Sequence, residues 1–173
     1  MAVSQEQLKF IMQRFDTYIS GANTKGAFLL AFNTFLCGGL LTNYTTLTGL
    51  VGPNLSTYLK VGLFLLIVAG IISLVIVLLA VYPFLKSGNS SPDQYHSLIY
   101  FGSVSAFVTP EKYIDALKKQ EEPEAYTDMA KQIHQLSKAL RKKYWQLEWA
   151  TKIIFFQLAV VIYCIALIII HSL

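Results

Sequence analysis

The sequence predicts an all-α integral membrane protein with about three transmembrane helices, a mostly helical cytoplasmic region and at most one short extended segment. Three observations predict this fold class. Hydrophobic residues make up 54% of the 173 residues and charged residues only 14%, against roughly 25% in an ordinary soluble domain. Stretches apolar enough to cross a bilayer recur three times. Lysine and arginine are unevenly divided between the segments that connect these stretches.

Residues 1–25 are predicted to form a cytoplasmic amphipathic helix. Apolar side chains recur at three- and four-residue steps from Leu8 to Ile19, and polar side chains fill the other face. A cleavable signal peptide has a charged start, a short apolar core and a small-residue cleavage site in that order, and this segment does not follow that pattern. We therefore expect the helix to lead directly into the first span.

The first predicted span, residues 26–47, is the most polar of the three. Asn33 and Thr34 lie inside it, and a polar side chain at bilayer depth needs a neighbouring helix or a wet cavity. Both residues are therefore candidates for a membrane pathway or pore. Ala27 and Ala31 offer a small-residue face on which a neighbouring helix can pack closely.

The other two spans are more continuous. Residues 48–57, rich in Gly, Pro and Asn, are predicted to form an extracytoplasmic turn that leads into the second span, residues 58–85. The third span covers residues 149–172. Trp145 and Trp149 lie where an interfacial aromatic belt is expected.

Positive charges predict the orientation. Residues 48–57 contain no Lys or Arg. Three such residues precede Gly26, and residues 86–152 contain ten, with Lys86 and Lys152 counted. Cytoplasmic segments carry the cationic excess, so the N-terminus and the connector at residues 86–148 are predicted to be cytoplasmic. With three crossings, the C-terminus emerges on the far side.

The connector begins with a turn-rich stretch at residues 87–94. Residues 97–108 then carry Tyr, Phe, Val and Ile around a glycine, which favours a short strand or a packed extended segment. A helix is expected to follow, because Thr109, Pro110 and Glu111 provide an N-cap, a first-turn proline and a first-turn acid.

A second connector helix is expected to open near Glu124, after Pro123. No Gly or Pro interrupts it before the third span, so one helix of about 48 residues is predicted to rise into the bilayer. It should run parallel to the N-terminal helix, since both enter a span from the cytoplasm. If Lys25 and Lys152 mark the same membrane surface, equal rise brings Asp16 level with Lys143, and we expect a salt bridge there.

Several function classes are disfavoured. The chain has no phosphate-binding glycine loop, no HExxH, no GxSxG and no cysteine pair with zinc-site spacing. Cys37 and Cys164 lie inside apolar stretches and carry no redox argument. We therefore expect no enzymatic activity, no metal and no cofactor. The net charge of +4 is better explained by membrane orientation than by a nucleic-acid partner.

The remaining polar residues suggest a pocket for a small anionic ligand. Cations suit a phosphate, Tyr or Phe suits a base, and Asn or Gln can read the base edge. The candidate ligand-binding residues are Asn23, Lys25, Tyr100, Phe101, Ser103, Asp128, Gln132 and Lys143. The competing interpretation is helix capping and anchoring at the cytoplasmic surface, which is favoured for Lys25 taken alone.

Three motifs follow one another along the chain: N-T-K-x-A-F-L-L-A-F-N, then Y-F-G-S-V-S, then D-M-x-x-Q-I-x-x-L-S-x-x-L-x-x-K-Y-x-x-L-x-x-A before the last span. This order resembles the Pycsar transmembrane effector family, PycTM, over nearly the whole chain. The positions that match the family pattern are Asn23, Lys25, Tyr100, Phe101, Gly102, Asp128, Gln132, Ser137, Lys143 and Tyr144.

The resemblance implies a multi-pass effector of the bacterial inner membrane in antiphage defence. A partner pyrimidine nucleotide cyclase would make cyclic UMP or cyclic CMP on infection, and the effector would bind it and impair the membrane, aborting infection. A homo-oligomer in contact with lipid is expected, because three spans leave little room for a pathway within one protomer.

Two other functions stay open. A constitutive pore-forming or holin-like toxin would need the spans but not the connector. A non-signalling membrane scaffold would use the apolar stripe from Met129 to Leu147 for a partner helix. Neither accounts for the Y-F-G-S-V-S segment.

Overall fold

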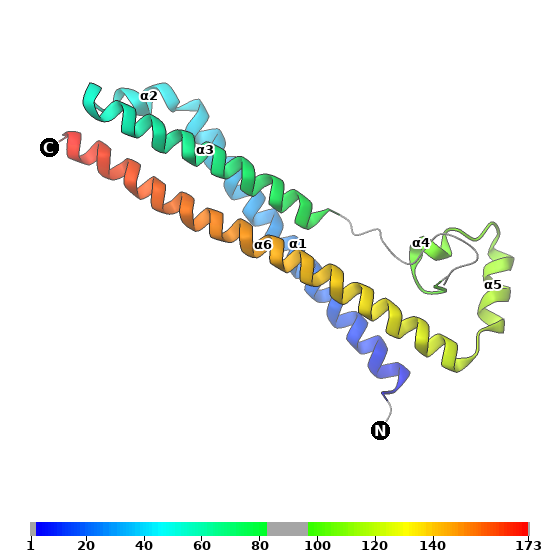
Figure 1. Ribbon diagram of the computed structural model, residues 1–173. Helices are drawn as coiled ribbons and strands as arrows, with labels where there is room; N and C mark the ends of the chain where they lie inside the picture. The colour runs from blue at the N-terminus through cyan, green and yellow to red at the C-terminus, as the bar shows by residue number, and fades with distance from the viewer. Residues whose placement is uncertain (1–2, 83–96, 173) are drawn as a thin grey trace. The chain divides into compact units, whose positions relative to one another are not determined.

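The computed structural model describes residues 3–82 and 97–172, and 88% of these residues are helical. The helices are α1 (Gln5–Thr42), α2 (Tyr44–Gly49), α3 (Pro53–Val81), α4 (Phe101–Val104), α5 (Pro110–Lys119) and α6 (Glu122–Ser172), drawn in Figure 1. No strand occurs in the described ranges. The predicted all-α fold is confirmed, and α1, α3 and α6 are long and apolar enough to cross a membrane.

The chain divides into two compact units. The span unit contains residues 21–82 and 143–172, and the connector unit contains the described residues 3–20 and 97–142. The helices α1 and α6 each contribute to both units.

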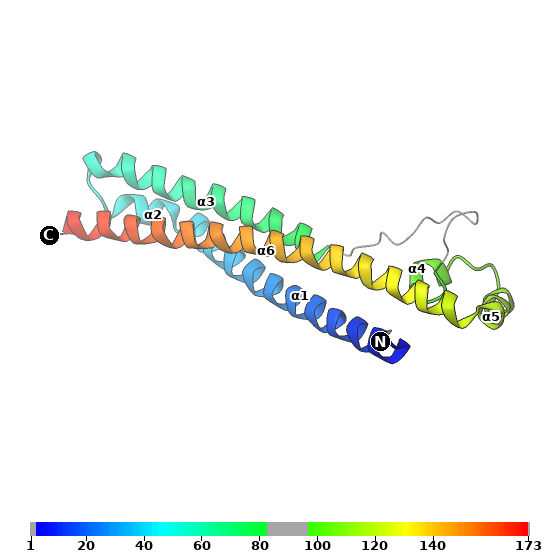
Figure 2. The same cartoon turned by 60° about the horizontal axis from the view of Figure 1, so that its bottom comes forward.

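In the span unit, α1, α3 and α6 lie side by side, with α3 antiparallel to the other two (Figures 1 and 2). One apolar cluster joins Leu59, Leu63 and Leu66 of α3 to Cys164 of α6. A second cluster joins Ala22, Ala80 and Leu147, one residue from each helix. The buried residues of α3 recur mainly at three- and four-residue steps from Leu59 to Ala80, so a single face of this helix packs into the core.

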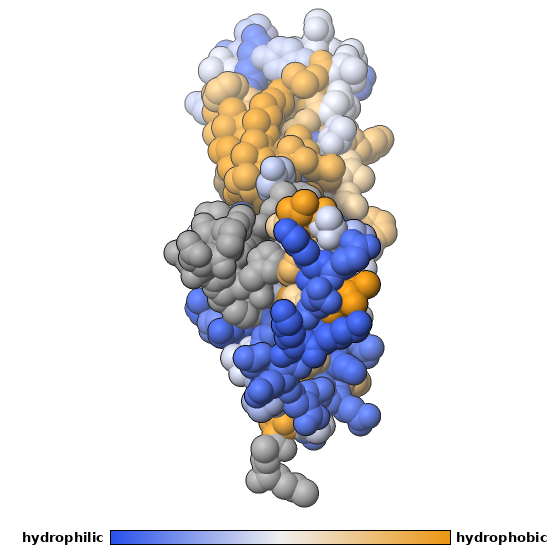
Figure 3. Space-filling model, turned by 90° about the vertical axis from the view of Figure 1, so that its right-hand side faces the viewer, coloured by the Kyte–Doolittle hydropathy of each residue, from blue (hydrophilic) through white to orange (hydrophobic). Residues whose placement is uncertain are grey.

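The outward faces of these helices are apolar as well. Phe64 on α3 is 64% exposed, and Phe155 and Ile162 on α6 are 68% exposed. Figure 3 shows hydrophobic side chains gathered over one part of the surface and hydrophilic side chains over another. Large apolar patches of this kind mark contact with lipid or protein, and on helices of this length lipid is the expected environment.

The first span differs from its predicted bounds. The helix α1 ends at Thr42, five residues before the expected end at Leu47, because Thr42 and Asn43 turn their side chains back to carbonyls of α1. The short α2 follows. The expected turn at residues 48–57 is narrower than predicted, since only residues 50–52 separate α2 from α3.

Close packing of α1 uses a different face from the one expected. Ala27 and Ala31 are exposed, whereas Ala22 and Gly26 meet the other two helices. Residues 83–85 of the second predicted span, the turn-rich stretch at 87–94 and Leu173 lie outside the described residues.

In the connector unit, residues 97–108 do not form the short strand that was one of the two expected alternatives. Bends lead into the helical turn α4, because the Ser97 hydroxyl accepts hydrogen bonds from the backbone amides of Ile99 and Tyr100 and closes a turn there. The N-cap at Thr109 is confirmed, since its side chain accepts from the Lys112 amide.

The long helix is confirmed as α6, which has 51 residues. It begins at Glu122, two residues earlier than expected, because Pro123 is accommodated in its first turn. The Gln5 side chain donates to the Glu122 carbonyl at 3.5 Å. The first turns of α1 and α6 are therefore neighbours in the connector unit, as parallel helices require.

Gly70 provides a test of the core of the span unit. A Cβ at Gly70 would collide with Cys37 Sγ and lie 3.1 Å from Gln157 Nε2, whereas a Cβ at Gly39 would meet nothing within 4 Å. We expect Gly70→Leu to lower the free energy of unfolding by about 1–3 kcal/mol through overpacking. Gly39→Leu should leave it nearly unchanged. Unfolding in detergent micelles measures both, and equal effects of the two variants would contradict this packing.

Candidate functional site

A cavity of about 900 Å³ lies in the connector unit. Residues 106–108, helix α5 and the first three turns of α6 form most of its walls, with Leu98 completing them. Small-molecule pockets measure roughly 300–1,000 Å³, so the cavity has room for a ligand of nucleotide size.

Backbone contacts of Leu98 hold the walls together. Its amide donates to Asp128 Oδ2 at 2.9 Å, and its carbonyl accepts from the Tyr113 hydroxyl at 2.9 Å. Since Asp128 belongs to α6 and Tyr113 to α5, both helices are fastened to the segment between them. The Tyr113 ring also packs on Phe107, with ring centroids 5.3 Å apart.

The electrostatics of the cavity favour an anion. Lys112, Lys119 and Lys131 contribute three cations to its lining, against the two carboxylates of Glu124 and Asp128. The first turn of α6 also borders the cavity, and the N-terminus of a helix carries partial positive charge. An anionic group therefore has cations on two helices within one cavity.

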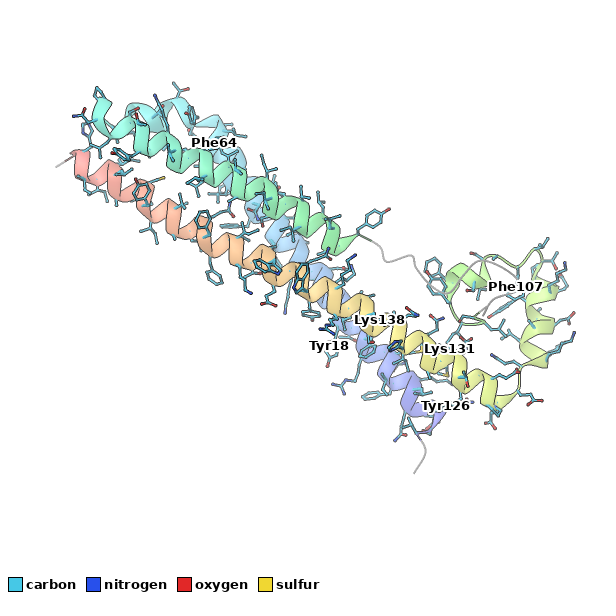
Figure 4. All side chains as sticks on the ribbon, viewed as in Figure 1. Tyr18, Phe64, Phe107, Tyr126, Lys131 and Lys138 are labelled. Atoms are coloured by element: carbon cyan, nitrogen blue, oxygen red, sulfur yellow. The ribbon has the colours of Figure 1, made fainter. Side chains whose placement is uncertain are left out.

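The apolar part of the lining is suited to a flat ring. Phe107 contributes an aromatic side chain, and Ala106, Val108 and Ala116 contribute small or branched apolar ones. Figure 4 labels Phe107 together with Lys131 in this part of the chain. Aromatic faces stack on nucleic-acid bases with little dependence on base identity.

Of the five candidate residues predicted in the connector unit, Asp128 lines the cavity. Tyr100, Phe101, Ser103 and Gln132 are absent from its lining. Ser103 and Gln132 are buried, whereas Phe101 is 65% exposed and its ring stacks on Tyr100 with centroids 4.6 Å apart.

Gly102 has a packing role in the Y-F-G-S-V-S motif. A Cβ at this position would collide with Cε1 of the Tyr100 ring and would lie 3.2 Å from its Cδ1. The glycine therefore allows Tyr100 to fold back over the turn α4. This accounts for part of the motif without any ligand.

The other three candidates, Asn23, Lys25 and Lys143, belong to the span unit, where Asn23 and Lys143 are in contact. Lys143 Nζ donates to the Ala80 carbonyl at 2.6 Å and to Asn23 Oδ1 at 3.1 Å, which joins α6 to the end of α3 and to α1. Ala80 lies in the last turn of α3, where carbonyls lack helical partners, so the ammonium caps that helix. Burial lowers the pKa of Lys143 below its usual range.

The predicted salt bridge between Lys143 and Asp16 is wrong about the partner of Lys143. The Lys143 ammonium donates to Asn23 Oδ1 and to the Ala80 carbonyl instead. Lys25 is exposed, and its ammonium lies 5.7 Å from the centre of the Tyr144 ring. A cation over an aromatic ring at the end of a span is a typical anchor at the membrane surface. The contacts of Lys25 and Lys143 thus support the anchoring interpretation in the span unit.

The two candidate pathway residues separate. Asn33 is fully buried between helices, whereas Thr34 is exposed on α1.

Sequence reasoning missed the lysines and Phe107 of the cavity. The signal available was the seven-residue spacing of Lys112 and Lys119, which places both on one face of a helix.

The model of the family described as Pycsar effector protein domain, PycTM, matches residues 7–170. The chain belongs to this family. PycTM membership assigns it the role of an antiphage defence effector within cyclic pyrimidine nucleotide signalling. Together with three membrane-competent helices, it places the chain in a membrane. No curated protein and no solved structure was found to match the chain.

Asp128 provides a test of the cavity's construction. We expect Asp128→Ala to loosen residues 97–108, because the Leu98 amide loses a charged acceptor worth about 1.5–3 kcal/mol. Hydrogen exchange of residues 97–108 should accelerate accordingly. Asp115→Ala, which removes an exposed carboxylate from α5, is the matched control. Unchanged protection in Asp128→Ala would contradict the anchoring role of Asp128.

Proposed function

We propose that this PycTM protein binds a cyclic pyrimidine mononucleotide, cyclic UMP or cyclic CMP, in the cavity of the connector unit and then impairs the inner membrane. The observation that carries the proposal is a nucleotide-sized cavity with three lysines and an aromatic ring. Its occurrence in a member of a cyclic-nucleotide effector family narrows the choice of ligand.

The chemistry of the ligand matches the lining. A 3′,5′-cyclic phosphate carries one negative charge, for which Lys112, Lys119 and Lys131 are suitable donors. The free 2′-hydroxyl can donate to Glu124, whose carboxylate borders the cavity. Phe107 offers a face for the base, and the Gln120 amide can present either a donor or an acceptor to its edge.

The long helix α6 connects ligand binding to the bilayer in this proposal. Its first three turns line the cavity, and its last 24 residues make up the predicted third span, residues 149–172. A ligand that binds one packing of α6 more tightly than another shifts the population toward that packing. The same shift then reaches the bundle of spans, since one helix serves both units.

The proposal places the protein in a wider system. The N-terminus and the connector face the cytoplasm, where a pyrimidine nucleotide cyclase supplies the ligand. The apolar outer faces of the spans contact lipid, and a homo-oligomer provides the pathway or the disruption that aborts infection. No metal, cofactor or catalytic step is part of the proposal.

Nucleotide binding by the purified full chain in detergent is the direct test. We expect saturable binding of cyclic UMP or cyclic CMP by calorimetry, and weaker or no binding of cyclic AMP. Lys119→Ala should weaken the affinity about tenfold, because it removes one charge-assisted contact to phosphate. Lys118→Ala is the matched control, because Lys118 is the sequence neighbour of Lys119 but lies outside the lining.

The two lysine variants separate a specific site from general attraction to a basic surface. Equal losses in Lys119→Ala and Lys118→Ala would point to nonspecific attraction. If folded, monodisperse wild-type protein binds none of the three nucleotides, the binding proposal is refuted and a scaffold is favoured.

Deletion of residues 87–123 distinguishes the effector from a constitutive toxin. This deletion removes α4, α5 and much of the cavity lining but leaves all three spans. We expect cells that make the cyclic nucleotide to survive expression of the deleted chain and to die with the full chain. A toxin of the holin type would kill in both cases, with or without nucleotide.

A further inference from the structure

A layer of polar side chains crosses the span unit at the middle of its three helices. Asn33 of α1 donates through Nδ2 to the Ser73 hydroxyl of α3 at 3.0 Å. The Ser73 hydroxyl donates to the Ala150 carbonyl of α6 at 3.4 Å. Gln157 of α6 donates through Nε2 to the Leu66 carbonyl of α3 at 3.3 Å. All three side chains are 0% exposed.

Two oxygen atoms of this layer accept no hydrogen bond from any residue that the structure describes. They are Asn33 Oδ1 and Gln157 Oε1, which belong to different helices. Exchanging the two amide atoms of Asn33 would set its oxygen against the Leu29 carbonyl oxygen, so the bond of the nitrogen to Leu29 fixes the assignment. Each amide nitrogen therefore has an acceptor, whereas each amide oxygen has no donor among the described residues.

Gly70 of α3 brings these groups close to one point. A Cβ at Gly70 would lie 3.1 Å from Gln157 Nε2 and 3.7 Å from Asn33 Oδ1, and would collide with Cys37 Sγ. The helices are therefore in close contact at this layer, and side chains fill the space beside the glycine. The described packing is a closed one.

Interhelical adhesion explains only part of the layer. Polar side chains hold spans together by hydrogen bonds, and the Asn33–Ser73 and Gln157–Leu66 contacts serve that purpose. Adhesion alone does not require amides whose oxygens remain without donors, because an unpaired buried acceptor is unfavourable and a serine or threonine donates as well. Unpaired polar atoms at bilayer depth are expected where water or an ion passes.

We propose that Asn33, Ser73 and Gln157 of each protomer line the path by which water and monovalent cations cross the active homo-oligomer. In the closed packing the two amide oxygens have no partner. When the helices separate along this face, the oxygens gain water or cations as partners, which stabilises the open arrangement. This inference deepens the proposed function and rests on its membrane-impairing part.

Potassium flux from proteoliposomes tests the path. Wild-type protein is reconstituted over a range of protein-to-lipid ratios, with and without the cyclic pyrimidine nucleotide, and release of trapped K⁺ is followed. We expect Asn33→Leu and Gln157→Leu to reduce the flux about tenfold, since each removes an amide that partners the ion. Both variants should still bind the nucleotide saturably, because neither residue lines the cavity.

Thr34→Val is the matched control, because Thr34 neighbours Asn33 but is exposed on the outer face of α1. It should leave the flux unchanged. Loss of flux in Thr34→Val with normal flux in Asn33→Leu would overturn the proposal and place the path along the outer face of α1. Normal flux in both Asn33→Leu and Gln157→Leu would overturn it as well.

Cys37 is a native reporter of the same layer, since it is buried and approaches Gly70. In a Cys164→Ala chain, a charged thiol reagent should label Cys37 in the presence of nucleotide and not in its absence. Failure to label during measurable K⁺ flux would contradict an opening at this layer, without relying on any variant of the polar residues.

Calorimetry on every variant keeps the two proposals apart. If no nucleotide binds to the wild type, the proposed ligand is wrong. The flux of the wild type at high protein density, and its loss in Asn33→Leu, then still decides whether the layer is a path. If nucleotide binds and no K⁺ leaves at any density, the path is wrong and the binding stands.

Discussion

A bilayer offers no hydrogen-bond partners, and lipid tails solvate an apolar side chain as well as another protein helix does. The span unit must therefore be specified by close packing and by polar contacts rather than by the hydrophobic effect. Gly26 and Gly70 are examples of close packing, since a methyl group at either would collide with a side chain of a neighbouring helix. Polar contacts within the spans are the hydrogen bonds from Asn33 to Ser73 and from Gln157 to Leu66.

Burial within the protein places a related constraint on Lys143, which precedes the third span. A buried ammonium is unfavourable unless it is fully engaged, and this one contacts a helix-end carbonyl and an amide oxygen. Its position also fixes the register of α6 against α3 and α1 within the span unit. A side chain that the sequence offered as one of eight candidate ligand contacts thus has a structural role.

The connector unit is built in a different way. Helix α5 has no fully buried residue, so its position depends on particular contacts, among them the Tyr113 hydroxyl on the Leu98 carbonyl. Weakly buried elements open at low free energy, and ligand-binding elements are drawn from that class. A cavity between α5 and α6 is consistent with a unit that a ligand completes.

Sequence patterns predicted the structural features that depend on residues close together in the chain. The Thr109 cap, the uninterrupted helix after Pro123 and the three apolar stretches are encoded by residues adjacent in the chain. The strand at residues 97–108 was mispredicted because β-branched and aromatic residues favour strands on average, whereas the Ser97 hydroxyl binds two amides and closes a turn.

The candidate site was predicted less well, since it depends on tertiary contacts. Asp128 was found as a polar residue in a motif, but Lys112 and Lys119 join the cavity only because α5 and the first turns of α6 form walls of the same cavity. Likewise, Gln157 is one polar residue in an apolar stretch of sequence. Its relation to Asn33 became visible only when the helices were placed together around Gly70.

The division of the chain also bears on how such a protein can change over evolutionary time. The connector unit is assembled from two separate stretches of sequence, and both α1 and α6 pass from it into the span unit without a break in the helix. The whole connector unit therefore cannot be exchanged as one uninterrupted stretch of sequence. The cavity lining, by contrast, falls between Leu98 and Lys131, so a change of ligand specificity can be confined to that stretch.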